Sequence, residues 1–315
     1  MTEKVLVTGG VGFIGSHIVD KLVQEGFDVV VVDNLSTGDV QNVNSLARFY
    51  HADINNASFI FKKEQPDYVA HHAAQINVRS SIDDPVNDAE QNIMKSLRLI
   101  ELCRKFKTKK FVFASSGGTV YGNPDSLPAK EDAELKPLSP YGIAKATVER
   151  YLEFYFRNFG FEYIALRYAN VYGPRQNPKG EAGVISVFIN QMLNGQRPCI
   201  WGDGAQTRDF VYVDDVAEAN LAAIRYTGQF RRFNIGYGEE TSVNSVFALL
   251  AKYLDSGDHS HNLEYKEELP RIILDCSLAA RELGWKAKVS LEQGLRRTIS
   301  YFEDKRNIPN DLFIG

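Results

Sequence analysis

Short apolar runs alternate with amphipathic segments through the first half of the chain. Segments 15–26 and 89–106 have helical spacing, whereas continuous apolar runs are typical of strands buried on both faces of a parallel sheet. Such runs occupy residues 4–10, 27–33, 66–74, 109–116 and 162–174. Strands and helices that alternate in this way predict an α/β fold with a doubly wound parallel sheet.

The pattern becomes looser after about residue 170. A turn-rich loop at 172–183 precedes helical spacing at 184–195, 242–254 and 277–305, and residues 231–238 are strand-like. We therefore expect two lobes, with the sheet in residues 1–169 and a smaller α+β lobe in residues 170–315. Residues of about 205–235 are expected to return to the first lobe.

The segment that follows Tyr141 carries apolar side chains on nearly every side of its predicted helix. They are Val148, Tyr151, Leu152, Phe154, Tyr155 and Phe156. A helix of this kind is buried on two faces. One face can cover the sheet, and the other is available to a second subunit. The sequence thus predicts a homodimer through helices at about 89–106 and 142–158.

The composition excludes several classes of protein. The chain has 315 residues, 44% of them hydrophobic, and a net charge of −4 without a basic block, which gives nucleic-acid binding little support. Cys103, Cys199 and Cys276 are far apart, which argues against a zinc site or disulfides and favours a reducing compartment. A strand begins almost at the first residue, and no apolar run is long enough to span a membrane. We expect a cytoplasmic protein.

A glycine-rich loop joins the first strand to the first helix. Gly9, Gly12 and Gly15 allow a tight turn, close approach of a pyrophosphate, and close packing of helix and strand. Asp33 ends the second strand, where a carboxylate can bind ribose hydroxyls and repel a 2′-phosphate. This pattern predicts a Rossmann-type doubly wound parallel sheet that binds NAD, with a smaller α+β C-terminal substrate lobe. The alternative for Asp33 is a turn residue at the strand end.

Other residues in the first lobe are candidates for contact with the cofactor. Asp53 and Ile54 follow a third apolar run and are placed to frame the adenine. Residues 71–75 end the next strand with small side chains, which lets the backbone approach a ligand. Asn92 lies inside the long helix, where a capping or packing amide is an equally good explanation.

Tyr141 and Lys145 lie one helical turn apart. A tyrosine is a poor base at neutral pH, but a neighbouring ammonium and a cationic nicotinamide ring both favour the phenolate. Ser115 and Ser116 end a predicted parallel strand, where α/β sheets bind ligands. These groups suit removal of a proton from an alcohol while hydride passes to NAD⁺. We favour Ser116 as the hydroxyl, with Ser115 and Thr119 as alternatives.

These motifs resemble the extended short-chain dehydrogenase/reductase superfamily. The shared features are T-G-G-x-G-F-I-G-S-H, Asp33, the serine pair before V-Y-G, and Y-G-x-x-K. Residues 166–176, 202–217 and 233–238 are similar to the nucleotide-sugar epimerase branch, most closely the UDP-glucose 4-epimerase family. The likeness covers nearly the whole chain. Related dehydratases and decarboxylases carry an acid just before V-Y-G, where this chain has Gly-Gly-Thr, so epimerisation is favoured.

The resemblance implies a mechanism and a set of contacts. Tyr141 takes a proton from the sugar C4 hydroxyl, hydride passes to bound NAD⁺, and the 4-keto sugar rotates before both return to its other face. Lys145 also holds the nicotinamide ribose, and the implied catalytic residues are Tyr141, Lys145 and Ser116. The implied cofactor contacts are Gly9, Gly12, Phe13, Ile14, Gly15, Asp33, Asn34, Asp53, Ile54, Ala73, Ala74, Gln75, Asn92, Tyr141, Lys145 and Tyr168. No metal is expected.

The resemblance also implies the contacts with a UDP-sugar. They are Ser116, Asn170, Val184, Arg208, Glu268 and Arg271. Arg208 can instead pair with Asp209 or Asp214, although its fork geometry suits phosphate. The family's R-x-G-D sequence becomes Tyr265 to Glu268 here, so Arg271 is the nearest substitute for the missing arginine. Ile272 falls where relatives have a residue that controls access of N-acetylated sugars.

Three functions agree with the sequence to different degrees. The first is inversion at C4 of UDP-glucose and UDP-galactose. The second is epimerisation of another nucleotide sugar, such as a UDP-N-acetylhexosamine, UDP-glucuronate, or a GDP- or dTDP-sugar. The third is a non-catalytic cofactor-sensing or RNA-associated protein on the same fold, which the presence of both Tyr141 and Lys145 disfavours.

Overall fold

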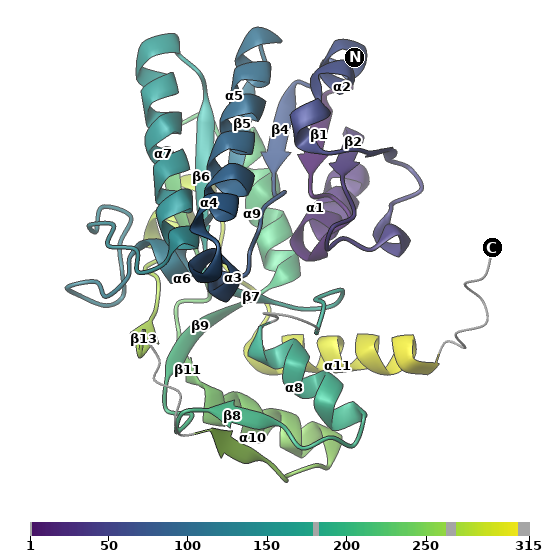
Figure 1. The fold of residues 1–315 in the computed structure, drawn as a ribbon, viewed down its shortest axis with the longest axis vertical. Coiled ribbons are helices and arrows are strands. Elements are labelled where there is room, and N and C mark those ends of the chain that lie inside the picture. Colours follow the sequence, from purple (N-terminus) through teal and green to yellow (C-terminus); the bar gives the residue numbers. More distant parts are fainter. Residues whose placement is uncertain (1, 179–182, 263–268, 308–315) are drawn as a thin grey trace.

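A seven-stranded parallel sheet forms the centre of the first lobe (Figure 1). The protein is described by a computed structural model for residues 2–178, 183–262 and 269–307. In the sheet, the strands follow the order β10-β6-β5-β4-β1-β2-β3. Their bounds are β1 Lys4–Thr8, β2 Asp28–Asp33, β3 Arg48–His51, β4 Tyr68–His71, β5 Lys110–Ser116, β6 Tyr163–Tyr168 and β10 Arg232–Ile235. The predicted α/β class is confirmed.

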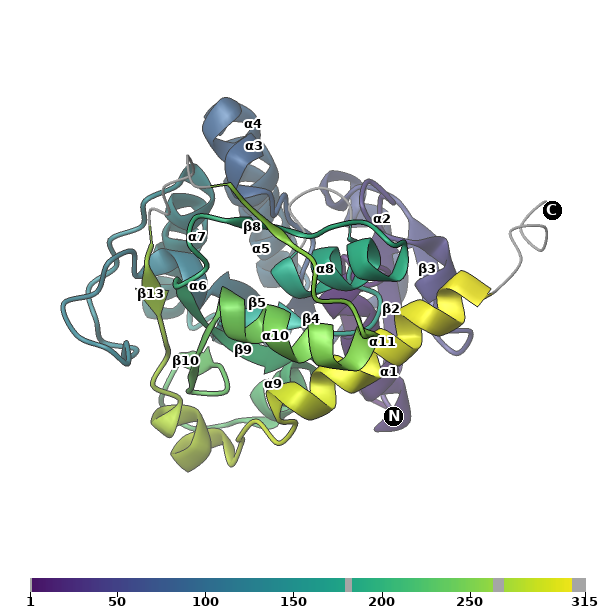
Figure 2. The same ribbon diagram turned by 90° about the horizontal axis from the view of Figure 1, so that it is seen from below.

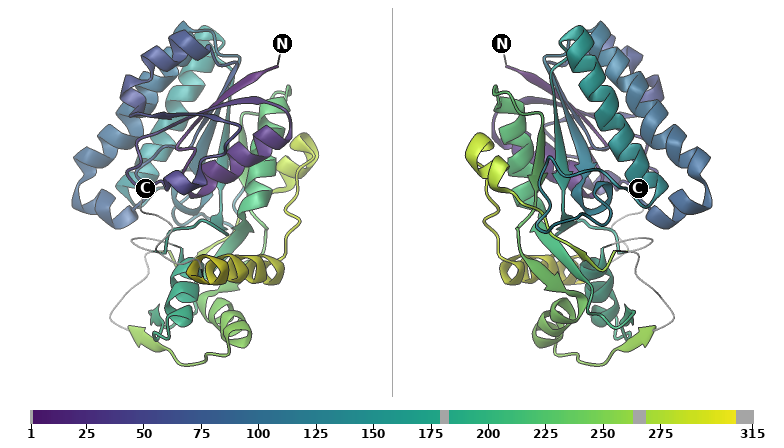
Figure 3. Two further views of the ribbon diagram at one scale, coloured as in Figure 1. Left: turned by 90° about the vertical axis from the view of Figure 1, so that its right-hand side faces the viewer. Right: turned by 90° about the vertical axis from the view of Figure 1, so that its left-hand side faces the viewer.

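Helices cover both faces of this sheet, as the two side views in Figure 3 show. On one face, α1 (Phe13–Gln24) packs beside α9 (Val213–Arg225), and their apolar side chains share a core with β1 and β6. On the other face lie α2 (Ser58–Glu64), α5 (Lys95–Lys105) and α7 (Pro140–Phe159). Burial on both faces explains why the strands are continuous apolar runs.

The predicted helix at 89–106 is not one regular helix. It consists of the end of α4 (Pro85–Ala89), a π-helical turn at Glu90–Met94, and α5. Short helices α3 (Val78–Asp83) and α6 (Gly117–Val120) and 3-10 turns at Val40–Asn42 and Ile54–Asn56 complete the connections. A π-turn inside an α-helix is often found at functional sites, and this one carries Asn92.

The second lobe lies below the carboxyl ends of the strands (Figures 1 and 2). Its helices α8, α10 and α11 pack around an apolar core that includes Phe188, Phe247 and Ile299. The bounds of its elements are β7 Asn170–Tyr172, α8 Val184–Leu193, β8 Cys199–Trp201, β9 Thr207–Tyr212, β11 Glu240–Ser242, α10 Val243–Leu254, β12 Ser260–Asn262, β13 Arg271–Ile272 and α11 Leu291–Asn307.

Two expectations for the second half need correction or refinement. Residues 277–305 are not helical throughout, because a π-helical segment at Ala279–Leu283 ends at Gly284, whose φ is 63°, and α11 begins only at Leu291. Of the segments near 205–235, α9 and β10 lie in the first lobe, whereas β9 pairs with β7, β11 and β13 in the second. Within the described ranges, the helices are all too short or too polar to cross a membrane.

Glu64 on α2 connects side chains of β1 and β3. This contact should make the stability of the protein fall at acid pH. Its carboxylate accepts hydrogen bonds from Tyr50 (2.6 Å), Lys4 (2.9 Å) and Arg48 (3.2 Å). Burial alone would raise the pKa of Glu64, but these partners outweigh it and lower the pKa to about 2. The stabilisation is therefore present above the unfolded-state pKa of 4.5 and is lost as the pH falls towards 2.

We expect Glu64→Gln to lower the free energy of unfolding by about 1–3 kcal/mol at pH 7. Urea unfolding of both proteins at several pH values checks this, and the difference between them should shrink below pH 4. Glu101→Gln is the control, because Glu101 is a solvent-exposed partner of Arg104 and should cost much less. A difference that is the same at pH 3 and pH 7 would contradict the assignment.

Candidate active site

The glycine loop closes tightly between β1 and α1. Gly9 has a φ of 68°, and its N–H donates to the Val32 carbonyl at 2.9 Å. A Cβ on Gly15 would lie 2.1 Å from the Gly9 carbonyl oxygen, and a Cβ on Gly9 would lie 2.7 Å from the Ala73 nitrogen. Both contacts are impossible for a side chain. The packing therefore requires glycine here, and it brings the loop after β4 against the loop after β1.

The start of α1 fits a dinucleotide pyrophosphate. Gly12 is the N-cap residue and provides no side-chain cap, and the helix begins with Phe13 and Ile14. The N–H groups of a first turn carry partial positive charge and suit a phosphate. Phe13 turns its ring edge-on to His17, whereas Ile14 packs on the core of the α1 face. The residues present thus fit the phosphates of NAD.

Asp33 is held at the end of β2 by two backbone N–H groups. Leu35 donates to one carboxylate oxygen at 2.8 Å and Val11 to the other at 3.3 Å. Each oxygen keeps a lone pair for a further donor. The carboxylate is thereby oriented beside the glycine loop, since Val11 belongs to that loop. This geometry agrees with a contact to ribose hydroxyls. The same carboxylate also stabilises the turn at Leu35, which was the alternative role for Asp33.

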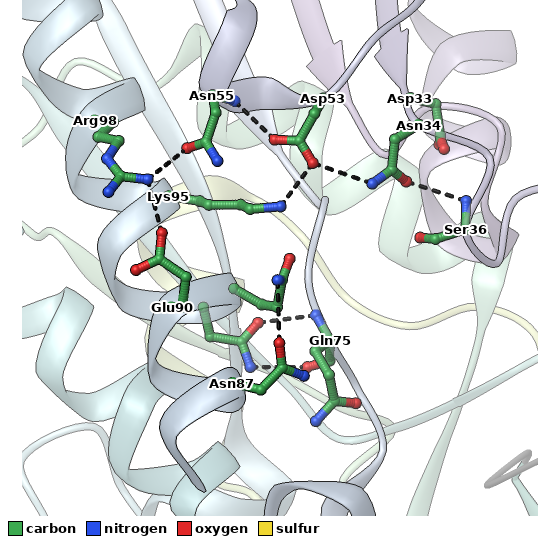
Figure 4. A network of polar contacts seen from close by, with 12 residues as sticks. Asp33, Asn34, Ser36, Asp53, Asn55, Gln75, Asn87, Glu90, Lys95 and Arg98 are labelled. Carbon is green, nitrogen blue, oxygen red and sulfur yellow. Dashed lines mark hydrogen bonds and ion pairs between the residues drawn. The ribbon is translucent and has the colours of Figure 1, made fainter. Parts of the chain in front are cut away.

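A chain of polar contacts connects the ends of β2 and β3 to α5 (Figure 4). Asp53 accepts hydrogen bonds from the side chains of Asn34 at 3.2 Å and Lys95 at 2.6 Å. Its carboxylate also accepts from the backbone N–H of Asn55. Burial alone would raise the pKa of Asp53, but Lys95 and the backbone N–H lower it overall. Asp53 is therefore ionised and fixed. Ile54, the next residue, is buried in the core below it.

Asn92 fixes the loop that follows β4. Its side-chain amide both donates to and accepts from the backbone of Gln75, each at 2.9 Å, and donates to Asp88 at 2.8 Å. The Gln75 side chain also donates to Asp88, at 2.9 Å. Asn92 therefore has the packing role that was one of its two predicted roles. Its amide holds the segment of Ala73, Ala74 and Gln75 in place beside the glycine loop.

Ser116, Tyr141 and Lys145 meet at the carboxyl end of β5. The Lys145 ammonium donates to the Ala114 carbonyl at 2.9 Å and lies 5.5 Å from the centre of the Tyr141 ring. The Tyr141 backbone N–H donates to the Ser81 hydroxyl at 3.3 Å, which attaches the start of α7 to α3. Ser139 caps the same helix by accepting from Gly142 at 3.2 Å.

Burial is the largest influence on the pKa values of Tyr141 and Lys145. Burial raises the pKa of Tyr141, the nearby Asp88 carboxylate raises it further, and a hydrogen bond with Ser116 lowers it only in part. Burial also lowers the pKa of Lys145 to about 8, although Asp88 opposes this change. The Lys145 ammonium is directed at the Ala114 carbonyl, and the predicted shift of Tyr141 towards phenolate by Lys145 together with the nicotinamide ring stays a prediction. The phenol is protonated at neutral pH.

The three candidate hydroxyl groups have different surroundings. The Ser116 side chain interacts with Tyr141, whereas the Ser115 hydroxyl is buried and donates to Glu149 at 2.5 Å. The Thr119 hydroxyl is buried and has no hydrogen-bond partner among the described residues. This arrangement favours Ser116 over the two alternatives.

The two glycines before Thr119 face different surroundings. A Cβ on Gly117 would lie 2.5 Å from Leu274, so that position is part of the packed core. A Cβ on Gly118 would meet Asn170 at 3.6 Å and Ser116 at 4.0 Å, with nothing closer. Position 118 therefore lies beside Ser116 and Asn170 and contributes no acid.

The second lobe places its candidate residues at several points around the site. Asn170 begins β7, close to Ser116, whereas Val184 begins α8. Arg208 lies on β9 and donates to the Thr207 carbonyl at 2.8 Å. Of its two alternative partners, Asp209 is buried and accepts from the backbone N–H groups of residues 237, 238 and 274, and Asp214 bonds to His17. Neither carboxylate is oriented by Arg208.

The remaining candidates for substrate contact lie in and just before β13. Arg271 forms a bidentate ion pair with Glu240, at 2.9 and 2.7 Å, and is largely exposed. A substrate phosphate would have to compete with Glu240 for this guanidinium. Glu268 and Tyr265 lie outside the described residues. Ile272 is 2% exposed and packs with Val120 and Leu274 in the core.

Sequence reasoning missed several side chains that organise the site. Asp88 and Ser96 lie four residues before and after Asn92, so helical spacing marks all three as one face. Ser96 bonds to His71 at 2.9 Å, and His71 bonds to the Thr8 hydroxyl at 2.7 Å. Tyr168, a predicted cofactor contact at the end of β6, bonds through its hydroxyl to His72 and Asn220. The described ranges hold no group of side chains suited to a metal ion.

Comparisons with known proteins agree with this geometry. Residues 5–236 match the model of the NAD dependent epimerase/dehydratase family. The fold is similar to a UDP-glucose 4-epimerase from Thermotoga maritima solved with UDP-glucose, at 47% identity and a TM-score of 0.94, covering 96% of this chain and 100% of that one. A UDP-N-acetylglucosamine 4-epimerase from Methanobrevibacter ruminantium is 35% identical, with a TM-score of 0.90 and coverage of 97% and 100%. A UDP-glucose 4-epimerase from Mycolicibacterium smegmatis is 40% identical over 313 residues, covering 96% of this chain and 99% of that one.

Proposed function

The chain belongs to the NAD-dependent epimerase/dehydratase family, and we propose that it inverts C4 of UDP-glucose and UDP-galactose through a transient 4-keto sugar. The observation that carries the proposal is the meeting of Ser116, Tyr141 and Lys145 at the carboxyl end of β5. The family and the NAD cofactor agree with the resemblance found in the sequence. The identity of the sugar and the reaction through a 4-keto intermediate are what we propose.

In this proposal each lobe binds one half of the reacting pair. The first lobe holds NAD through the glycine loop, Asp33, the Asp53 contacts and the loop fixed by Asn92. The second lobe holds the UDP-sugar through Asn170, Arg208 and the backbone near Val184. The sugar then lies at the carboxyl end of β5, between the lobes, where open α/β sheets bind their ligands.

The residues of this chain divide the chemistry between them. When bound, NAD⁺ supplies the hydride acceptor and a positive ring whose charge favours the phenolate. Tyr141 then accepts the proton of the sugar hydroxyl and later returns it. Ser116 hydrogen-bonds the same oxygen and keeps the phenol oriented. Lys145, held by the Ala114 carbonyl, provides positive charge behind Tyr141 and a donor for the ribose.

The test is a product analysis with purified protein. UDP-galactose is incubated without added cofactor, then with added NAD, and the sugars are separated by chromatography. We expect UDP-glucose as the product. Tyr141→Phe, purified in the same way, controls for a contaminating enzyme. Absence of conversion of UDP-galactose in both conditions would refute this substrate assignment.

A UDP-N-acetylhexosamine is the second candidate substrate. Ile272 is buried in the core beside Val120 and Leu274, so its side chain is not exposed to restrict an N-acetyl group. The similarity to a UDP-N-acetylglucosamine 4-epimerase supports the same possibility. Parallel incubations with UDP-N-acetylgalactosamine and UDP-glucuronate distinguish these substrates. Conversion of the first but not of the second would support acceptance of a neutral N-acetyl group.

The exposed face of α7 supports a homodimer, which we propose as the working form. Ile143, Tyr151, Phe154 and Phe159 leave large apolar surfaces in water, and Phe154 is 48% exposed. Patches of this kind mark protein interfaces. Sedimentation should give twice the mass of the chain, and Phe154→Glu should give a monomer. A wild-type monomer at micromolar concentration would contradict the proposal.

A further inference from the structure

Helix α7 presents a third polar side chain in line with the two catalytic ones. Tyr141, Lys145 and Glu149 are spaced four residues apart and therefore share one face. Lys145 bonds to the carbonyl of Ala114, and Glu149 accepts from the hydroxyl of Ser115 at 2.5 Å. The helix is thus attached to two successive residues of β5, immediately before Ser116.

Glu149 is itself fixed by a buried ion pair. Arg167 donates to its two oxygens, at 2.6 and 3.2 Å to one and at 3.0 Å to the other, and the side chains are only 1% and 2% exposed. Arg167 is also the neighbour of Ser115 across strands β5 and β6. The planar guanidinium fixes the orientation of the Glu149 carboxylate. The Ser115 hydroxyl can therefore donate to this carboxylate from one direction.

The same arginine connects this group to distant segments. It donates to the Tyr121 hydroxyl at 2.8 Å and to the Glu131 carbonyl at 2.9 Å. Tyr121 in turn donates to Asn234 at 2.6 Å, and Asn234 donates to the Asp275 carbonyl at 3.1 Å. Asp275 follows β13, which carries Arg271. The buried chain therefore runs from the catalytic helix to the segment that carries a candidate substrate contact.

We propose that Glu149 is a positioning residue, which acts through Ser115 to hold the end of β5 so that Ser116 meets Tyr141. This inference rests on the proposed function, because it concerns the same reacting groups. Glu149 is buried, and its carboxylate bonds to Arg167 and Ser115. Its effect is geometric, and small displacements of a reacting group can cost up to about a hundredfold in rate.

Ser115→Ala tests the proposal with the least disturbance. It removes one hydroxyl and leaves the Glu149–Arg167 pair intact, so the fold should persist. We expect kcat to fall about tenfold, with KM for the sugar nucleotide changed less than twofold. Because the bond with Ser116 lowers the pKa of Tyr141, the acid limb of the kcat profile should also move to higher pH.

Two other variants complete the experiment. Tyr121→Phe breaks the chain between Arg167 and Asn234 and should reduce kcat less than Ser115→Ala does. Glu64→Gln is the matched control, since it removes a buried, ion-paired carboxylate that bonds to β3 at the edge of the sheet and should leave kcat and its pH profile unchanged. If Ser115→Ala keeps the wild-type kcat and pH profile, the group only stabilises the fold and the proposal is wrong. Failure of the wild-type protein to convert any UDP-sugar would instead refute the proposed function.

Discussion

Tyr141→Phe should reduce kcat by about a thousandfold, while the protein remains folded and able to bind NAD. The change removes one oxygen, which in the proposed reaction is the only group of α7 that receives the proton. Positioned acid–base groups typically contribute about 10²–10⁴-fold. The phenol is protonated in the structure, because burial and Asp88 both raise its pKa. Activity therefore depends on positive charge that lowers this pKa, and kcat should fall at acid pH.

Steady-state kinetics with UDP-galactose from pH 5 to pH 9 measure both effects. Tyr151→Phe is the matched control. Tyr151 lies on the same helix but on the face proposed to meet a second subunit, where the loss of one hydroxyl should leave kcat at the wild-type value. Thermal unfolding of each variant confirms that the fold is unchanged. A Tyr141→Phe protein with more than about a tenth of wild-type kcat would require another base, and Ser116 would be the first group to examine.

The first lobe was predictable because its physical constraints are local. Strands buried on both faces must be continuously apolar. The loop between β1 and α1 requires glycine at position 15, because a Cβ there would lie 2.1 Å from a backbone oxygen. Both constraints leave a direct trace in consecutive residues. Asp33, the last residue of its strand, is placed by the same short segment.

The contacts that organise the catalytic group were not predictable in the same way. Glu149 meets Arg167 and Ser115 only after α7 has packed on β5 and β6, and nothing in the local sequence shows which partner a charged residue will find. The π-turn at Glu90–Met94 also depends on packing, since Asn92 within it bonds to the loop after β4. Its neighbours Asp88 and Ser96 could have been found from their helical spacing.

The second lobe was harder to predict because its strands are short. β8, β11 and β12 have three residues each and β13 has two, which is too few for an alternating pattern. The pairing of Arg271 with Glu240 joins β13 to β11 across β9, a contact that only the sheet order explains. The family resemblance therefore suggested Arg271 as a substrate contact without showing that Glu240 competes for its guanidinium.

Arg167→Met should lower the free energy of unfolding by about 3–5 kcal/mol, because it leaves the Glu149 carboxylate buried without its ionic partner. The Tyr121 hydroxyl and the Glu131 carbonyl also lose a donor. For a chain of this size we expect the Tm to fall by roughly 10 °C. Burial alone would lower the pKa of Arg167, but the Glu149 carboxylate outweighs burial and raises this pKa overall, so Arg167 stays charged.

The double variant Glu149→Leu/Arg167→Met decides whether the loss comes from an unpaired charge or from lost packing. Replacing both ions by apolar side chains of similar size removes the uncompensated charge, so much of the stability should return. Activity should not return with the stability, because Glu149→Leu removes the acceptor of the Ser115 hydroxyl. Urea unfolding and kcat are measured on the same samples. If the two single changes simply add in the double variant, the ion pair has no coupling energy and this account of the core beneath Ser116 is wrong.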